Sequence, residues 1–138
     1  MTPEQLVEIE RIKQLKARYF RLMDTKQWPE WTQVFTEDAV LQWGPKDDNV
    51  FRGRDEIVQS VSHVLREATT CHHGHMPEIE LAGADRARGI WAMYDYVESP
   101  QFVLHGFGHY HEEYRKADGT WRIARLKLTR LREDRQMK

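Results

Sequence analysis

Residues 108–123, GHYHEEYRKADGTWRI, contain the pattern that decides the fold. Asp118-Gly119 is a dipeptide typical of the tight turn of a β-hairpin. On both sides of this turn, the character of the side chains alternates from one residue to the next. Such alternation is typical of a β-strand, in which neighbouring side chains point to opposite faces of the sheet. We therefore expect an antiparallel pair of strands at 102–116 and 120–132. The same pattern predicts two earlier long strands, at 70–82 and 86–98.

The first half of the chain has the spacing of helices instead. Thr2 and Gln5 form a capping box with Pro3 at the first helical position, and an apolar stripe then recurs every three or four residues as far as Met23. Shorter elements are expected after it: helices at 29–35 and 55–67, a strand at 39–43 and a turn or loop at 44–49. Helices followed by antiparallel strands indicate an α+β fold, with the helices packed on one face of a curved sheet.

Composition excludes several classes of protein. A chain of 138 residues is long enough for one domain with a real core. Its charged residues nearly balance, at a net charge of −1, so we expect no nucleic-acid partner and no anionic membrane surface. Cys71 is the one cysteine, which excludes an intrachain disulfide and fits a reducing cytoplasm. The N-terminus has no basic segment before an apolar run, so a cytoplasmic location is expected.

Six of the seven histidines fall in two short stretches, 72–75 and 105–111. Imidazole is the side chain whose ordinary pKa lets it exchange a proton near neutral pH, so the stretches suggest proton chemistry. Two other uses are a structural role in a polar cavity and a metal site. For a metal, the histidines at 73 and 75 could converge with those at 109 and 111, but strand pairs of this kind are weak evidence. We therefore predict no metal site and no cofactor.

Strand alternation places two charged residues among apolar neighbours. Asp95 shares a face with Trp91 and Met93, and Arg130 is in phase with Leu128. Burying either charge is costly unless it is paired or has a function. The pattern therefore indicates either a plain Asp–Arg ion pair or polar groups that serve a binding site.

Other candidate residues stay ambiguous when the pattern alone is used. Phase does not choose among His72, His73 and His75, because Gly74 or Pro77 can introduce a bulge in their strand. Tyr19 lies on the apolar stripe of the first helix, as a core aromatic residue also would.

Asp24 falls at the end of the same helix, where the helix dipole disfavours a carboxylate. It is therefore either solvated or required there for another reason.

Several segments together resemble SnoaL-like proteins of the nuclear transport factor 2-like superfamily, over about residues 8–132. The segments are KARYFRLMD at 16–24, WTQVF at 31–35, HHGHMPEI at 72–79, GIWAMYD at 89–95, GHYHEEY at 108–114 and LTR at 128–130. The resemblance implies a single SnoaL-like domain over residues 1–138, with a cystatin-like, cone-shaped barrel of helices on a curved sheet. This fold supports dehydratases, isomerases, cyclases and non-catalytic modules.

Within the superfamily the chain resembles the bile acid 7α-dehydratases and, more distantly, the scytalone dehydratases. The first resemblance carries a catalytic tyrosine, aspartate and histidine onto Tyr19, Asp24 and His72. It implies that the histidine is a general base, that Asp24 orients it, and that Tyr19 donates to a developing enolate. It also places substrate-binding or mutually supporting roles on Asp95 and Arg130.

The function expected from these residues is a cofactor-independent dehydratase that removes water from a hydroxylated, cyclic, steroid- or polyketide-like substrate. An isomerase or polyketide cyclase uses the same groups, and a non-catalytic small-molecule-binding module is the further alternative. The substrate would be small, apolar and ring-containing. Further side chains predicted to contact it are Trp43, Met76, Trp91, Met93, Phe107 and His109. His105, His109 and His111 could instead face a subunit interface, because the resemblance implies a homodimer or homotrimer.

Overall fold

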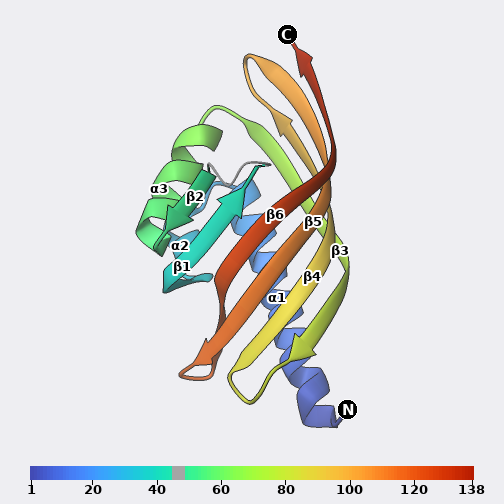
Figure 1. Cartoon of the computed structure of the whole chain (residues 1–138). Helices are drawn as coiled ribbons and strands as arrows, with labels where there is room; N and C mark the ends of the chain where they lie inside the picture. The colour runs from blue at the N-terminus through green and yellow to red at the C-terminus, as the bar shows by residue number, and fades with distance from the viewer. Residues whose placement is uncertain (45–48) are drawn as a thin grey trace.

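In residues 1–44 and 49–138, which the computed structural model describes, three helices and six strands follow one another (Figure 1). Their bounds are α1 Pro3–Asp24, α2 Trp28–Thr32, β1 Phe35–Trp43, β2 Asn49–Arg52, α3 Arg54–Leu65, β3 Thr69–Leu81, β4 Arg86–Glu98, β5 Phe102–Ala117 and β6 Thr120–Met137. The loop expected at 44–49 lies mostly outside the described residues. The α+β prediction is confirmed.

The strands form one sheet in the order β2-β1-β6-β5-β4-β3. Neighbours pair antiparallel except β1 and β6, which run parallel. Figure 1 shows that the long strands β3 to β6 curve around α1, while α3 lies beside the short strands β1 and β2. The helices therefore cover one face of the sheet and leave the other face without a described helix. No helix of the described chain is long and apolar enough to cross a membrane.

Two strands extend beyond their expected bounds. β1 begins at Phe35, four residues before the expected start, because Phe35 pairs with Ile123 of β6. β6 continues to Met137, which pairs with Phe102. The residues from 131 onward are exposed and mostly charged, so their sequence resembles a solvated tail. The backbone hydrogen bonds between β6 and β5 do not depend on side-chain character, so these residues still form a strand.

The first helix begins where the sequence predicts. The Thr2 side chain accepts from the backbone of Gln5, and the Gln5 side chain accepts from the backbone of Thr2, at 3.1 and 2.9 Å. The inner stripe of α1 is buried from Ile12 to Met23, whereas Leu6, in the second turn, is exposed. Trp31 of α2, with no exposed surface, donates from Nε1 to the backbone oxygen of Tyr19 at 3.0 Å. This bond ties α2 to the turn of α1 that carries Tyr19.

A β-bulge in β3 resolves the phase of the histidines. The register against β4 shifts between His75 and Glu78, and Met76 inside the bulge has a positive φ of 49°. Because one residue is inserted there, His72 on one side and Ile79 on the other both face the helices. The bulge that the sequence allowed is thus present, and it explains why alternation counted back from Ile79 points to His73 and His75 instead of His72.

The core contains a charged pair that sequence reasoning did not single out. Lys16 of α1 donates to Glu112 of β5 at 2.5 Å, and neither side chain has exposed surface. Glu112 also accepts from the hydroxyl of Tyr114 at 2.6 Å, and that hydroxyl accepts from Trp91 Nε1 at 2.9 Å. Within residues 1–44 and 49–138, no buried side-chain nitrogen or oxygen lacks a hydrogen-bond partner, as burial requires.

Buried tyrosines predict a loss of stability in alkali. Burial raises the pKa of Tyr19, Tyr110 and Tyr114 above its usual value of 10. Above pH 10 the unfolded chain releases these phenolic protons while the folded chain keeps them. The free energy of unfolding should therefore fall as pH rises above 10, by up to about 1.4 kcal/mol per pH unit for each tyrosine. Urea unfolding between pH 8 and 11 measures the slope.

Tyr110→Phe isolates the contribution of one hydroxyl. Subtracting its pH profile from that of the unmodified protein cancels the other titrating groups, among them Lys16, whose pKa burial lowers to about 8. The free energy of unfolding of the unmodified protein minus that of Tyr110→Phe should fall above pH 10, because only the unmodified protein has this phenol. A difference that stays constant to pH 11 would contradict the assignment.

Candidate active site

A cavity of about 220 Å³ lies between the helices and the inner face of the sheet. Five residues predicted from the sequence line it, each from a different element: Tyr19 of α1, Trp43 of β1, His72 of β3, Asp95 of β4 and Arg130 of β6. The rest of the wall is mainly apolar and includes Val61, Leu65, Val97, Leu104, Leu126 and Leu128. An apolar cavity with a few convergent polar groups is the usual form of a small-molecule site.

Asp24 and His72 form a directly hydrogen-bonded pair at this cavity. The His72 Nδ1 atom lies 2.6 Å from Asp24 Oδ1, and the His72 backbone N–H donates to Asp24 Oδ2 at 2.9 Å. The hydroxyl of Thr70 donates to Oδ1 at 2.9 Å. An ionised carboxylate only accepts hydrogen bonds, so this contact requires a proton on Nδ1 and, in a neutral imidazole, leaves the lone pair on Nε2.

The same three donors explain why a carboxylate stands at the end of α1. The C-terminus of a helix is the negative end of its dipole and disfavours Asp24. The donors from β3, the side chains of Thr70 and His72 and the backbone of His72, offset this cost. The unfavourable position noted in the sequence therefore marks a residue that is held by the sheet. Thr70 was not predicted, and its position two residues before His72 on the same strand face is the pattern that could have found it.

Asp95 and Arg130 form the second polar feature of the wall. Arg130 donates from both terminal nitrogens to the two oxygens of Asp95, at 2.8 and 3.0 Å. Burial by itself would lower the pKa of Arg130, but the hydrogen bonds and charge of Asp95 raise it above its usual value. The expected ion pair therefore exists, and it lies in the cavity wall.

Gly106 makes room for that ion pair. A Cβ atom at this position would lie 1.6 Å from Arg130 Nη1 and 2.1 Å from Asp95 Oδ1, closer than atoms can approach. Gly106 sits on β5 opposite Asp95 of β4, so its missing side chain is the space that the guanidinium occupies. Sequence reasoning missed this residue, although a glycine inside a strand often marks such a close approach.

Tyr19 reaches the cavity from the helix side. Its ring is almost completely buried, and it packs edge-on against Phe35 and Tyr110. Burial raises its pKa first, and the carboxylate of Glu112 raises it further, although a hydrogen bond with Tyr110 acts in the opposite direction. The phenol therefore stays protonated at neutral pH and is able to donate a hydrogen bond into the cavity. Tyr110 also lines the cavity.

Five residues predicted to contact a substrate do not line this cavity. Trp91 and Met93 do point inward, but both are buried in the packed core. Met76 lies on the bulge of β3 and is 83% exposed. Phe107 and His109 lie on the outer face of β5, because residues with even numbers point toward the helices in this strand. The structure therefore does not bring these five residues to the inner cavity, and their contact with a substrate stays a prediction.

The remaining clustered histidines also lie on the outer face of the sheet. His105 Nδ1 is 2.7 Å from the hydroxyl of Tyr94, and His111 Nε2 is 3.1 Å from Thr129 Oγ1. His73 contacts the ring of Tyr94, so it lies outside as well, and His75, its alternate neighbour on β3, precedes the bulge on the same side. Within the described ranges, no three His, Cys, Asp or Glu side chains are placed to hold a metal ion.

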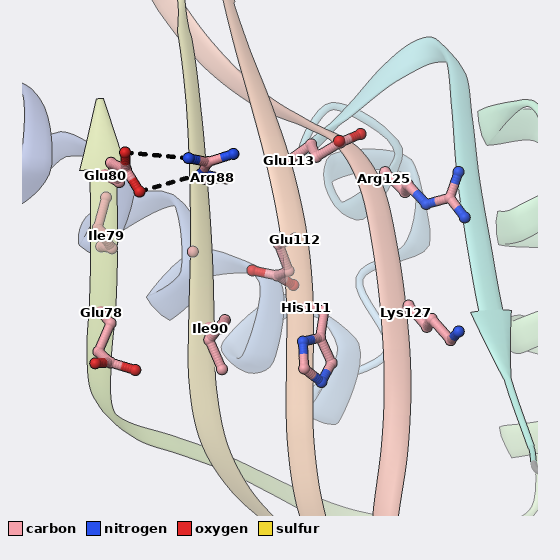
Figure 2. A pocket seen from close by; sticks show the side chains of 11 residues that line it. Glu78, Ile79, Glu80, Arg88, Ile90, His111, Glu112, Glu113, Arg125 and Lys127 are labelled. Carbon is pink, nitrogen blue, oxygen red and sulfur yellow. Dashed lines mark hydrogen bonds and ion pairs between the residues drawn. The ribbon is translucent and has the colours of Figure 1, made fainter. Parts of the chain in front are cut away.

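A wider groove of about 560 Å³ lies on the outer face, across β3 to β6 (Figure 2). Figure 2 shows charged side chains along it, including the ion pair between Glu80 and Arg88 at 3.1 Å. Both of these side chains are 66% exposed, and a surface pair of this kind contributes little energy. The groove contains neither His72 nor Asp24, so we assign the candidate active site to the smaller inner cavity.

The comparisons with known proteins agree with this fold. A profile of the SnoaL-like domain matches residues 4–127, so the chain belongs to the SnoaL-like domain family. A probable cyclase, FGR4 of Gibberella zeae, is 25% identical over 144 residues, which cover 95% of this chain and 94% of the cyclase.

Two solved structures show the same fold. A putative scytalone dehydratase from Novosphingobium aromaticivorans superposes with a TM-score of 0.87 at 22% identity, covering 97% of this chain and 91% of that one. A hexachlorocyclohexane dehydrochlorinase, LinA-type3 from Novosphingobium barchaimii, gives a TM-score of 0.83 at 18% identity, covering 96% and 92%. A protein from Nostoc punctiforme described as having a cystatin-like fold superposes with a TM-score of 0.72 at 19% identity, covering 90% of this chain and 91% of that one. The predicted nuclear transport factor 2-like, cystatin-like fold is therefore confirmed.

Gly106→Ala should disrupt the cavity wall. The added methyl group requires Arg130 to leave its place against Asp95, which leaves a buried carboxylate unpaired. We expect a loss of about 3–5 kcal/mol in the free energy of unfolding, measured by urea denaturation.

Gly106→Ala combined with Arg130→Ala and Asp95→Ala tests the cause. If the methyl group acts through the ion pair, the triple variant should be no less stable than Asp95→Ala/Arg130→Ala. Fully additive losses would show that the methyl group acts elsewhere.

Proposed function

We propose that this protein is a cofactor-independent lyase that eliminates water from a small, hydroxylated ring compound. The observation that carries the proposal is the pair of His72 and Asp24 at the cavity, with the phenol of Tyr19 in the same cavity. A base, the carboxylate that orients it and a hydrogen-bond donor are the groups that enolate chemistry needs. The fold-level likeness to a putative dehydratase and a dehydrochlorinase supports the same class of reaction.

The proposed reaction begins when His72 Nε2 removes a proton from the carbon next to a carbonyl group. The electron pair of that C–H bond moves into the carbonyl, and Tyr19 donates a hydrogen bond to the resulting enolate oxygen. Asp24 stabilises the imidazolium through Nδ1. When the enolate collapses, the C–O bond of the hydroxyl group breaks, and the imidazolium returns the proton to the leaving oxygen. The products are the conjugated ring compound and one molecule of water.

The size of the cavity limits the substrate. Sites for drug-sized ligands have volumes of about 300–1,000 Å³, and the inner cavity has about 220 Å³. Among the expected steroid- and polyketide-like compounds, this favours a substrate with one or two rings. The pair of Asp95 and Arg130 in the wall gives the ring a polar partner for a hydroxyl or carbonyl group.

An isomerase or cyclase is the second candidate, because both reactions pass through the same enolate. The likeness to the probable cyclase of Gibberella zeae favours it specifically. The two candidates differ only in whether the substrate has a leaving group beside the carbanion. The mass of the product separates them, since dehydration removes one water and isomerisation or cyclisation without elimination leaves the mass unchanged.

The expected partners and location remain predictions. A homodimer or homotrimer would use the outer face of the sheet, which no described helix covers (Figure 1). A cytoplasmic site of action fits the single Cys71.

Substitutions in the pair test the proposed function. Hydroxylated one- and two-ring ketones are screened with the unmodified protein, and products are followed by mass spectrometry. With a substrate in hand, we expect His72→Gln and Asp24→Asn each to lower kcat by about 10²-fold or more, because one loses the base and the other its orientation. His63→Gln, which changes a histidine of α3 outside the cavity lining, is the matched control. Near-normal turnover by both site variants would refute the mechanism.

A further inference from the structure

The most unusual buried group lies beneath the candidate active site. The Lys16 side chain has no exposed surface, and its ammonium lies 3.7 Å from the ring centroid of Tyr19 and 3.6 Å from that of Tyr110. Both rings line the inner cavity. Because an ammonium is attracted to the face of an aromatic ring, one cation here contacts two cavity walls at once.

Stability alone gives a poor reason for this arrangement. Taking Lys16 and Glu112 out of water costs several kcal/mol per ion, and apolar residues of the same volume often serve a core equally well. Burial also lowers the pKa of Lys16 to about 8, which shows that the site disfavours the charge. A charged pair, unlike an apolar pair, provides a fixed, directional contact between the ammonium and the two tyrosine rings.

The carboxylate is itself fixed in place. Glu112 accepts from Lys16 with one oxygen and from the hydroxyl of Tyr114 with the other. That hydroxyl lies directly over Gly89, where a Cβ atom would approach it to 2.9 Å. The ammonium is thus held against β4 and β5 and is unable to move without breaking the network. Its position relative to both rings is set by the sheet.

We propose that Lys16 is a positioning residue of the active site, whose ammonium holds the rings of Tyr19 and Tyr110 so that their hydroxyls face the substrate oxygen. This inference rests on the proposed function, since it gives Tyr19 the role of donor to an enolate. It extends that function by adding Tyr110, whose ring packs edge-on against that of Tyr19 and lines the same cavity, as a second hydroxyl for the same oxygen. Two aligned donors stabilise a developing oxyanion better than one.

The test compares two double variants that each replace a Lys–Glu pair by two glutamines. Lys16→Gln/Glu112→Gln removes the buried charges but keeps hydrogen-bonding groups of nearly the same volume. Lys116→Gln/Glu8→Gln is the matched control, because that pair also joins α1 to β5, at 3.0 Å, and its glutamate also accepts from an aromatic donor, Trp121.

Crystal structures of both variants provide a readout that needs no substrate. In Lys16→Gln/Glu112→Gln, the hydroxyls of Tyr19 and Tyr110 should leave their places in the cavity wall, whereas in the control they should stay. Lys16→Met/Glu112→Gln, which fills the space with an apolar chain, replaces the first variant if that one does not fold. Unmoved rings in the variant lacking the buried charges would overturn the proposal.

Kinetics provide the second readout. A displacement of about 1 Å at a reacting group costs about 10²-fold, so we expect kcat to fall about 10- to 100-fold with KM little changed. A purely structural pair would lower the melting temperature and leave kcat of the folded enzyme unchanged, and that result would overturn the proposal. If His72→Gln instead keeps full turnover, the proposed function fails, and the crystal structures still decide whether Lys16 holds the rings.

Discussion

The structure of the site depends on one carboxylate with three hydrogen-bond donors. Asp24 stands at the unfavourable end of α1, and the side chains of Thr70 and His72, together with the backbone of His72, hold it there. The same bonds dock the helix on the edge strand of the sheet and determine which imidazole nitrogen carries the proton. This contact therefore serves both the fold and the proposed chemistry, because the bonds that dock α1 also orient His72, the base of the proposed reaction.

Two further buried pairs complete the frame around the cavity. Arg130 and Asp95 fill the gap that Gly106 leaves in the wall. Lys16 and Glu112 lie on the other side, under the tyrosines. Buried charges are costly in a domain of this size, so their placement around one small cavity is what distinguishes this interior from an ordinary core. The outer face, although rich in histidine, carries its charged groups in solvent (Figure 2).

Local patterns predicted the fold well and the site in part. The capping box at Thr2 and the turn at Asp118-Gly119 act over a few residues, so the sequence alone reveals them. The resemblance to the bile acid 7α-dehydratases then pointed to His72. Strand alternation alone did not, because the bulge near Met76 shifts the phase of β3. Contacts between distant elements left no such local pattern. Lys16 on a helix face looks solvated until the strand carrying Glu112, 96 residues later, packs against it.

The central claim is that Asp24 binds the Nδ1 proton of His72 and leaves Nε2 as the base. Long-range ¹H–¹⁵N spectra of the ¹⁵N-labelled, ligand-free protein measure this directly, at a pH where the ring is neutral. The account predicts a single tautomer for His72, protonated at Nδ1, that is lost in Asp24→Asn. A ring protonated at Nε2, or one that averages between both tautomers as a free imidazole does, would contradict it.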